Sequence, residues 1–238
     1  MFNKKYDVVV VGGGHAGCEA AAASANLGSK TLLITMNLQT LGQMSCNPAM
    51  GGIAKGQIVR EIDALGGYSG IVSDYSAIQF KMLNKSKGPA MWSPRVQSDR
   101  SMFSLHWREL LEQTKNLDFY QETVTGLIVK NDKAIGVKTS MDVSIYSKSV
   151  ILTNGTFLNG LIHIGEKNFG GGRAGEKASF GLTSCLEGYG FVSGRMKTGT
   201  PPRVDGRSLN YSLMDEQPGD SNPGKFSFLK QTKALKAQ

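Results

Sequence analysis

The sequence predicts an α/β fold of three layers, in which a parallel sheet is joined by an antiparallel β-ribbon that crosses between strands. Residues 6–11 form a short β-branched run, which a glycine-rich turn connects to an alanine-rich helix at 15–27. A second apolar strand at 31–35 completes the strand–helix–strand order of a parallel pair. Strand-like residues 119–130 and 134–139 flank a short polar turn, as in an antiparallel hairpin.

The remaining elements follow in order. Residues 38–52 are expected to form a loop, and apolar spacing predicts helices at 53–65 and 101–113. Between those helices, residues 81–94 are basic and interrupted by glycine and proline, so we expect irregular structure there. Two further strands at 143–146 and 149–153 complete the ribbon, followed by a glycine loop at 165–175 and a short helix at 179–186.

Composition limits the class of protein. The chain has 238 residues, of which 40% are hydrophobic and 19% charged, as in a globular domain with room for part of another. Three scattered cysteines and three scattered histidines suggest neither a disulfide framework nor a metal site. No apolar run approaches the roughly 20 residues that span a bilayer. We expect a cytoplasmic protein that binds neither membrane nor metal.

The strongest motif is a glycine-rich turn between the first strand and the first helix. Glycines 12, 14 and 17 match the dinucleotide-binding pattern G-x-G-x-x-G. The first permits a tight turn, the second lets the backbone approach a pyrophosphate, and the third lets helix and strand pack closely. The N–H groups at the helix start attract the anion. The predicted cofactor-binding residues here are Gly12, Gly13, Gly14, His15, Ala16 and Gly17, with His15 facing cofactor or backbone.

One part of the usual pattern is missing. An acidic ligand for the ribose would stand about 20 residues later, near Asn37, where the strand ends in neutral residues. This departure disfavours a generic NAD dehydrogenase. The ribbon instead returns through residues 150–156, whose Thr153-Asn154-Gly155 ends a strand as in flavoproteins with two dinucleotide sites. The sequence therefore favours FAD, the alternative being an ordinary strand and turn.

Cys46 is the cysteine most suited to chemistry. It lies in a loop with Gly42, Gly51 and Gly52, just before a predicted helix, where a thiolate is favoured. No second cysteine lies four or five residues away, so Cys46 is not half of a redox disulfide of the disulfide-reductase kind. A buried packing role is the alternative, and it is the role we expect for Cys18 and Cys185.

Positive charge is unevenly distributed. The chain carries 27 basic and 19 acidic residues, and residues 81–108 contain one acid, Asp99. A local positive field attracts phosphate, either of a cofactor or of a nucleic acid, although a solubilising surface has the same composition. The predicted phosphate-binding residues are Lys81, Lys85, Lys87, Arg95 and Arg100.

Several segments together resemble one family, the MnmG/GidA (glucose-inhibited division protein A) flavoproteins. They occur in family order from residue 6 to about 228. The matching segments are residues 12–17 with 19–21, 40–49, 51–53, 83–90, 97–100, 171–175 and 197–203. Together they are far more specific than a glycine motif alone.

The resemblance implies an FAD-dependent, Rossmann-like domain that also uses NADH. Family members, with a GTPase partner, install a (carboxymethyl)aminomethyl group at C5 of the tRNA wobble uridine, using a methylene-folate, and a homodimer is expected. The resemblance also implies FAD contacts at Val124 and Ser179 and a catalytic role for Cys46. It divides the chain into an FAD-binding domain at 1–203, with its ribbon at about 118–149, and the start of a nicotinamide-binding insertion at 204–238, truncated and frayed.

Three rival functions stay open at this stage. The first is the related FAD- and folate-dependent tRNA uridine methyltransferase, against which the Met44-Ser45-Cys46-Asn47-Pro48 loop argues. The second is a generic flavin oxidoreductase, for which the basic stretch has no evident use. The third is a non-catalytic, truncated chain, because the family's second cysteine is missing and the fold is incomplete at its C-terminal end. We expect the isolated chain to be inactive.

Overall fold

The computed structural model describes residues 5–235. Contacts divide the chain into two compact units, each built from two stretches of sequence. The first unit contains Met1–Gln43 and Trp107–Arg195, and the second contains Met44–His106 and Met196–Gln238. The predicted boundary at residue 203 concerns cofactor binding rather than contacts, and it stays a prediction.

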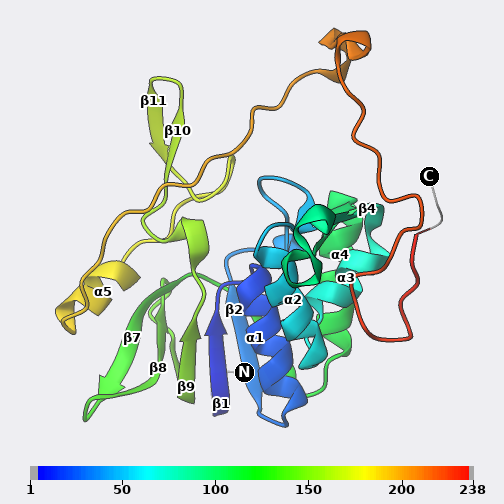
Figure 1. The fold of residues 1–238 in the computed structure, drawn as a ribbon. Coiled ribbons are helices and arrows are strands. Elements are labelled where there is room, and N and C mark those ends of the chain that lie inside the picture. Colours follow the sequence, from blue (N-terminus) through cyan, green and yellow to red (C-terminus); the bar gives the residue numbers. More distant parts are fainter. Residues whose placement is uncertain (1–4, 236–238) are drawn as a thin grey trace. The chain divides into compact units, whose positions relative to one another are not determined.

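The first unit is built on a six-stranded sheet with the order β6-β2-β1-β9-β8-β7 (Figure 1). Four of its strands are parallel: β1 (Tyr6–Val11), β2 (Thr31–Thr35), β6 (Leu117–Gln121) and β9 (Ser144–Leu152). The other two, β8 (Lys133–Thr139) and β7 (Val124–Lys130), continue the sheet from β9 as an antiparallel ribbon. The predicted α/β fold, with a ribbon joined to a parallel sheet, is therefore confirmed.

Small residues let helix α1 (His15–Asn26) lie close to this sheet (Figure 1). Its buried side includes Cys18, Ala21, Ala22 and Ala25. Burial raises the pKa of the Cys18 thiol to about 12, so this residue packs as a neutral group. Cys185 on α5 (Leu182–Gly188) accepts the N–H of Leu127 at 3.3 Å, which fastens that helix to β7. Both cysteines have structural roles, as expected.

Local backbone chemistry explains several details of the first unit. Asn131 and Asp132 adopt positive φ angles of 49° and 57°, which suits the tight turn between β7 and β8. The two strands predicted at 143–146 and 149–153 form the single strand β9. The predicted glycine loop at 165–175 was partly wrong, because a hairpin of β10 (Leu161–Ile164) and β11 (Lys167–Gly170) enters it. Gly165, with φ +58°, permits that turn.

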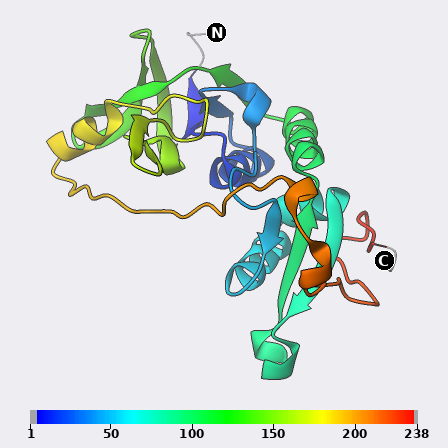
Figure 2. The ribbon, with the colours of Figure 1, turned by 90° about the horizontal axis from the view of Figure 1, so that it is seen from above.

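The second unit contains a three-stranded antiparallel sheet with the order β3-β5-β4 (Figure 2). Its strands are β3 (Ala49–Gly51), β5 (Ser93–Ser98) and β4 (Ala77–Leu83), and its helices are α2 (Lys55–Ala64) and α3 (Ser69–Tyr75). Helix α4 (Arg100–Gln113) starts in this unit, where Asp99 accepts the N–H groups of Ser101 and Met102 at 2.9 Å each. Within residues 5–235, short 3₁₀ turns lie at Leu38–Thr40, Lys85–Lys87, Pro89–Met91, Gly155–Phe157, Gly206–Ser208 and Tyr211–Leu213.

Two predictions for the second unit were wrong. Residues 38–52 are not all loop, since β3 ends that stretch, and residues 81–94 include the end of β4 and the start of β5. Pro94 misled the prediction because proline usually interrupts a central strand. Here it lies just beyond the last pair between β3 and β5, Gly51 with Arg95. Its carbonyl accepts the N–H of Gly52 at 3.0 Å, so the strand continues.

The later part of the described tail packs on the second unit, beginning where the Gln217 carbonyl accepts from Gln79 at 3.0 Å. Residues 204–216 are almost all exposed, and the fraying expected for residues 204–238 stays a prediction. Asp220 donates its N–H to the carbonyl of Phe80 at 2.9 Å, and its carboxylate accepts the N–H of Met82 at 3.0 Å. Farther along, the Phe226 side chain is fully buried. Figure 2 shows this red end of the chain beside the strands of the unit. The sequence offered little apolar surface here, and hydrogen bonds to carboxylates such as that of Asp220 hold the backbone instead.

Candidate functional site

The predicted glycine loop joins β1 to α1, and each glycine has a distinct steric reason. Gly12 has φ +106°, and a Cβ there would lie 2.6 Å from the carbonyl oxygen of Thr153. A Cβ on Gly17 would lie 1.7 Å from the carbonyl oxygen of Gly12, so only glycine lets α1 start this close to the strand. A Cβ on Gly13 would approach Leu41 within 2.7 Å. These three glycines shape the protein itself.

Gly14 is different, because a Cβ there would meet no protein atom within 4 Å. Its backbone is extended, with φ −76° and ψ −175°, and it gives α1 no side-chain cap. The N–H groups of the first helical turn therefore face an open, exposed position at the positive end of the helix dipole. Gly14 and Ala16 are both exposed. We call this open position, formed by Gly14 and the first turn of α1, the cradle. It fits a dinucleotide pyrophosphate.

The loop after β2 braces the glycine loop. Gly42 donates its N–H to the carbonyl of Gly13 at 2.8 Å, and its carbonyl lies 2.9 Å from Nε2 of His15. His15 therefore faces backbone, one of the two orientations expected for it. Asn37 accepts the N–H of Gln39 at 2.8 Å and so caps a 3₁₀ turn. The backbone of Glu122 lies beside the end of β2, where its N–H bonds to the carbonyl of Thr35 at 2.9 Å, while its carboxylate accepts from the Thr123 N–H and the Ser140 hydroxyl at 2.7 Å each.

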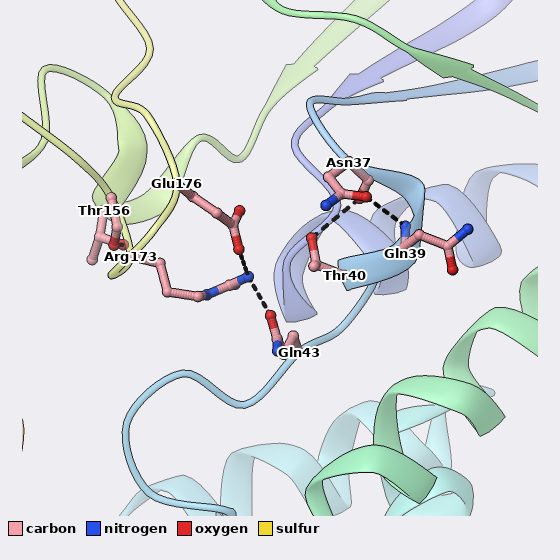
Figure 3. A network of polar contacts seen from close by, with 8 residues as sticks. Asn37, Gln39, Thr40, Gln43, Thr156, Arg173 and Glu176 are labelled. Carbon is pink, nitrogen blue, oxygen red and sulfur yellow. Dashed lines mark hydrogen bonds and ion pairs between the residues drawn. The ribbon is translucent and has the colours of Figure 1, made fainter. Parts of the chain in front are cut away.

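A polar network connects this loop to the second glycine-rich segment of the first unit (Figure 3). Arg173 donates to Glu176 at 2.7 Å and also bonds to the side-chain oxygen of Gln43. Its guanidinium lies 5.4 Å from the ring centre of Phe157, and its side chain is 19% exposed. Sequence reasoning used Arg173 only as part of a family motif. Its pairing partner three residues later was the signal for a structural role.

The two other predicted FAD contacts lie in the first unit. Val124 begins β7 and its side chain is buried in the core with Val137 and Ile145. Ser179 precedes α5 and is 4% exposed. Its N–H bonds to the carbonyl of Phe157, and its carbonyl accepts the N–H of Asn159, both at 2.8 Å. A cofactor role for these two residues stays a prediction.

Cys46 lies in the second unit, where residues far apart in sequence surround it. Its sulfur is 3.2 Å from the hydroxyl oxygen of Thr200. Arg100 donates to the backbone carbonyl of Cys46 at 3.5 Å, and Arg203 bonds to the same carbonyl. Two guanidinium groups therefore hold the backbone of a partly exposed thiol, which is an arrangement that suits a nucleophile.

Thr200 and Arg203 were missed as site residues by sequence reasoning. Both belong to the segment 197–203, which had been used only for its family resemblance. Its two prolines and exposed polar residues gave no periodic signal that could link it to Cys46. The link is tertiary and spans 154 residues.

The predicted phosphate-binding residues belong to the second unit, and several already have partners. The amino group of Lys81 donates to the carbonyl of Pro218 at 3.0 Å, and that of Lys85 pairs with Asp220 at 3.1 Å. Lys87 is exposed. Nε of Arg95 is buried without a hydrogen-bond partner among the described residues. A phosphate-binding role for the set stays a prediction.

Residues 5–235 contain neither a metal-binding cluster nor a membrane-spanning helix. No group of three or more His, Cys, Asp or Glu side chains is arranged to hold a metal ion. No helix in this part of the chain has the length and apolar character that crossing a bilayer requires.

Known proteins resemble the chain over its whole length. It is 74% identical over 238 residues to "tRNA uridine 5-carboxymethylaminomethyl modification enzyme MnmG" of Christiangramia forsetii, covering 100% of this chain and 38% of the relative. A relative of the same description from Flavobacterium psychrophilum is 72% identical, covering 99% of this chain and 38% of the relative. The chain thus spans a little over a third of the length of the curated relatives it matches.

Solved structures agree in fold. Aquifex aeolicus GidA superposes with a TM-score of 0.94 at 48% identity, covering 99% of this chain and 40% of that one. The GidA-related protein from Thermus thermophilus gives a TM-score of 0.57 at 22% identity over 79% of this chain and 69% of that one, which is a likeness of fold alone. The family model "Glucose inhibited division protein A" matches residues 7–238. The chain therefore belongs to the glucose inhibited division protein A family.

Proposed function

We propose that this chain is the FAD-binding part of an enzyme that installs a (carboxymethyl)aminomethyl group at C5 of the wobble uridine of tRNA. The observation that carries the proposal is the open cradle at Gly14, in a chain 74% identical to a relative described as a tRNA uridine modification enzyme. The cradle is the evidence for dinucleotide binding, and the relative's description is the evidence for the tRNA substrate. The cradle lies within the 238 residues that match that relative.

The proposed roles of the residues follow from their geometry. The backbone of Gly12, Gly13 and Gly14, with the first turn of α1 from His15 to Gly17, would hold the pyrophosphate of FAD by N–H donation and helix dipole. Val124 and Ser179 are proposed as further contacts on the nucleotide side of the cofactor. Bound FAD supplies hydride chemistry to the site. The protein's part there is to bind and orient.

Cys46 is proposed as the nucleophile that adds covalently to the uridine ring. The Thr200 hydroxyl 3.2 Å from its sulfur supports this role because a hydrogen bond there orients the sulfur. Arg100 and Arg203, bonded to the Cys46 carbonyl, would fix the loop and contribute positive charge. The proposed partners of the whole enzyme are tRNA, an MnmE-like GTPase, a second copy in a homodimer, NADH and a methylene-folate, acting in the cytoplasm.

A hybrid enzyme tests the proposal. Residues 1–238 would replace the matching first 38% of the Christiangramia forsetii relative, in a bacterium that lacks the modification. We expect mass spectrometry of digested tRNA to detect the modified wobble nucleoside with the hybrid. We expect Cys46→Ser to abolish it while flavin is retained.

The matched control is Cys185→Ser, because a serine oxygen still accepts the N–H of Leu127. We expect this variant to modify tRNA like the parent hybrid. Unchanged modification in Cys46→Ser would remove Cys46 from the chemistry. A stable, flavin-loaded hybrid with no modified nucleoside would refute the proposed substrate.

A further inference from the structure

A separate cavity of about 430 Å³ lies within the second unit. Its walls come from α2, β4, the turns after β4 and tail residues 220–228, and they include neither Cys46 nor any glycine-loop residue. Cavities that hold small ligands in proteins usually measure about 300–1,000 Å³. This cavity therefore has room for one nucleotide.

Two carboxylates, that of buried Asp63 and that of half-buried Asp74, hold the tail that forms one wall. Asp74 accepts the N–H groups of Phe226 at 2.5 Å and Ser227 at 2.9 Å, and Asp63 accepts the N–H of Phe228 at 2.7 Å. The Phe226 side chain is fully buried and anchors the segment. Phe228 is therefore presented to the cavity from a fixed backbone.

The cavity is lined by two partly exposed aromatic side chains. Phe228 is 57% exposed and Trp92 is 43% exposed. The guanidinium of Arg60 lies 4.6 Å from the Phe228 ring centre and donates to the carbonyl of Lys225 at 3.0 Å. The Trp92 indole N–H donates to the carbonyl of Lys85 at 3.2 Å. Such held aromatic and guanidinium planes are the surfaces on which unpaired bases stack.

The charged groups of the cavity attract an anion. Arg60, Lys85 and Lys225 line it, against the single carboxylate of Asp220. Lys225 bonds to the hydroxyl of Thr232 at 3.0 Å and to carbonyl oxygens, and Arg60 also bonds to a carbonyl. This partner orients Arg60 without neutralising it, whereas Lys85 is paired with Asp220 at 3.1 Å and Lys225 interacts electrostatically with the Asp74 carboxylate. Positive charge beside stacking faces matches a phosphate beside a base.

We propose that this cavity binds one unstacked nucleotide of a single-stranded RNA segment. Its base stacks on the Arg60–Phe228 pair and on Trp92, and its phosphate is attracted by the positive charge of Arg60 and Lys225. The inference rests on the proposed function, which supplies RNA as the substrate class. It adds a binding site outside the uridine chemistry, which holds a nucleotide of the substrate other than the one that reacts.

Fluorescence anisotropy of fluorescein-labelled pentauridylate, titrated with the 238-residue chain, tests this site. Phe228→Leu keeps an apolar side chain and removes the stacking face, so we expect affinity to fall by about fivefold or more. The matched control is Tyr211→Leu, which removes another exposed aromatic ring of the same unit, 65% exposed and outside the cavity. We expect that variant to bind like the parent chain.

Tryptophan emission gives a second readout that does not depend on a variant. Trp107 is fully buried, so quenching by bound RNA reports on Trp92. The expected result is quenching of Trp92 emission in the parent chain together with weaker RNA binding by Phe228→Leu. The assignment would be overturned if the parent and Phe228→Leu bound RNA with equal affinity, or if RNA bound without quenching. It would also be overturned if a reduced folate displaced the labelled RNA at a lower concentration than unlabelled RNA does. Flavin binding at Gly14 is measured separately, so a flavin-loaded chain that binds no RNA would refute this inference alone.

Discussion

The sulfur of Cys46 lies 3.2 Å from the hydroxyl oxygen of Thr200, although 154 residues separate the two in sequence. The contact joins a loop before β3 to the extended segment at residues 197–203, both in the second unit. It gives the thiol a hydrogen-bond partner that can act as donor when the sulfur is a thiolate. The proposed nucleophile is therefore oriented by a residue that no local pattern connects with it.

Removing the Thr200 hydroxyl should slow the reaction of Cys46 with iodoacetamide. Thr200→Val keeps the shape and removes the donor, and Thr200→Ser restores it. Because one hydrogen bond contributes about 0.5–1.5 kcal/mol, we expect the valine variant to react about 2- to 10-fold more slowly at neutral pH. Peptide-resolved mass spectrometry separates Cys46 from Cys18 and Cys185. Equal rates in the valine and serine variants would contradict this role.

Asp74, whose carboxylate accepts the N–H groups of Phe226 and Ser227, should give stability a particular pH dependence. Burial raises the pKa of Asp74 above its ordinary value, although two backbone N–H groups and Lys225 oppose the shift. The folded state therefore holds this proton more tightly than the unfolded state. Stability from the protonated group is present below the unfolded pKa of about 3.9 and is lost as pH rises through the raised folded value.

Urea unfolding of the parent and Asp74→Asn at a series of pH values measures this effect. The asparagine does not titrate, so the difference between the two free energies of unfolding isolates the carboxyl group. We expect the parent to lose stability relative to the variant as pH increases through the acidic range. A relative gain with increasing pH would mean that the N–H donors outweigh burial.

The basic residues of the second unit should make RNA binding sensitive to salt. If several of Lys81, Lys85, Lys87, Arg95 and Arg100 contact phosphate, the log–log plot of tRNA affinity against salt should have a slope of several units. Lys87→Gln should reduce that slope by about one. Lys81→Gln should change it less, because the Lys81 amino group is bound to the Pro218 carbonyl. Affinity that is flat from low to physiological salt would exclude phosphate contacts.

The first unit was predictable from sequence because its signals are local. Tyr6–Val11, the glycine turn and Thr31–Thr35 each carry their own pattern, and the structure has both strands at those bounds. The ribbon likewise follows from alternating strands around the Asn131–Asp132 turn. These elements establish the open position at Gly14 without knowledge of any long-range contact.

The second unit was less predictable because distant residues complete it. The end of strand β4 was hidden because Lys81 begins the basic stretch, and Pro94 argued against β5. The tail looked too polar to pack, yet Asp63 and Asp74 bind its backbone and Phe226 enters the core. A carboxylate that accepts backbone N–H groups more than 150 residues away leaves no periodic trace in the sequence. Thr200 was missed for the same reason.

The central claim is that FAD binds at the open cradle of Gly14. A valine at this position adopts its extended backbone readily and projects into space that no protein atom occupies. We therefore expect Gly14→Val to fold like the parent and to lose flavin. Gly17→Val is the contrasting variant, since a Cβ there would lie 1.7 Å from the Gly12 carbonyl oxygen and should destabilise the fold itself.

The most direct measurement is the flavin absorption spectrum of the purified chain after incubation with FAD and gel filtration, beside its circular dichroism. We expect a yellow parent chain, and a colourless Gly14→Val chain with an unchanged far-ultraviolet spectrum. A folded Gly14→Val chain that retains flavin at the parent's stoichiometry would contradict this expectation.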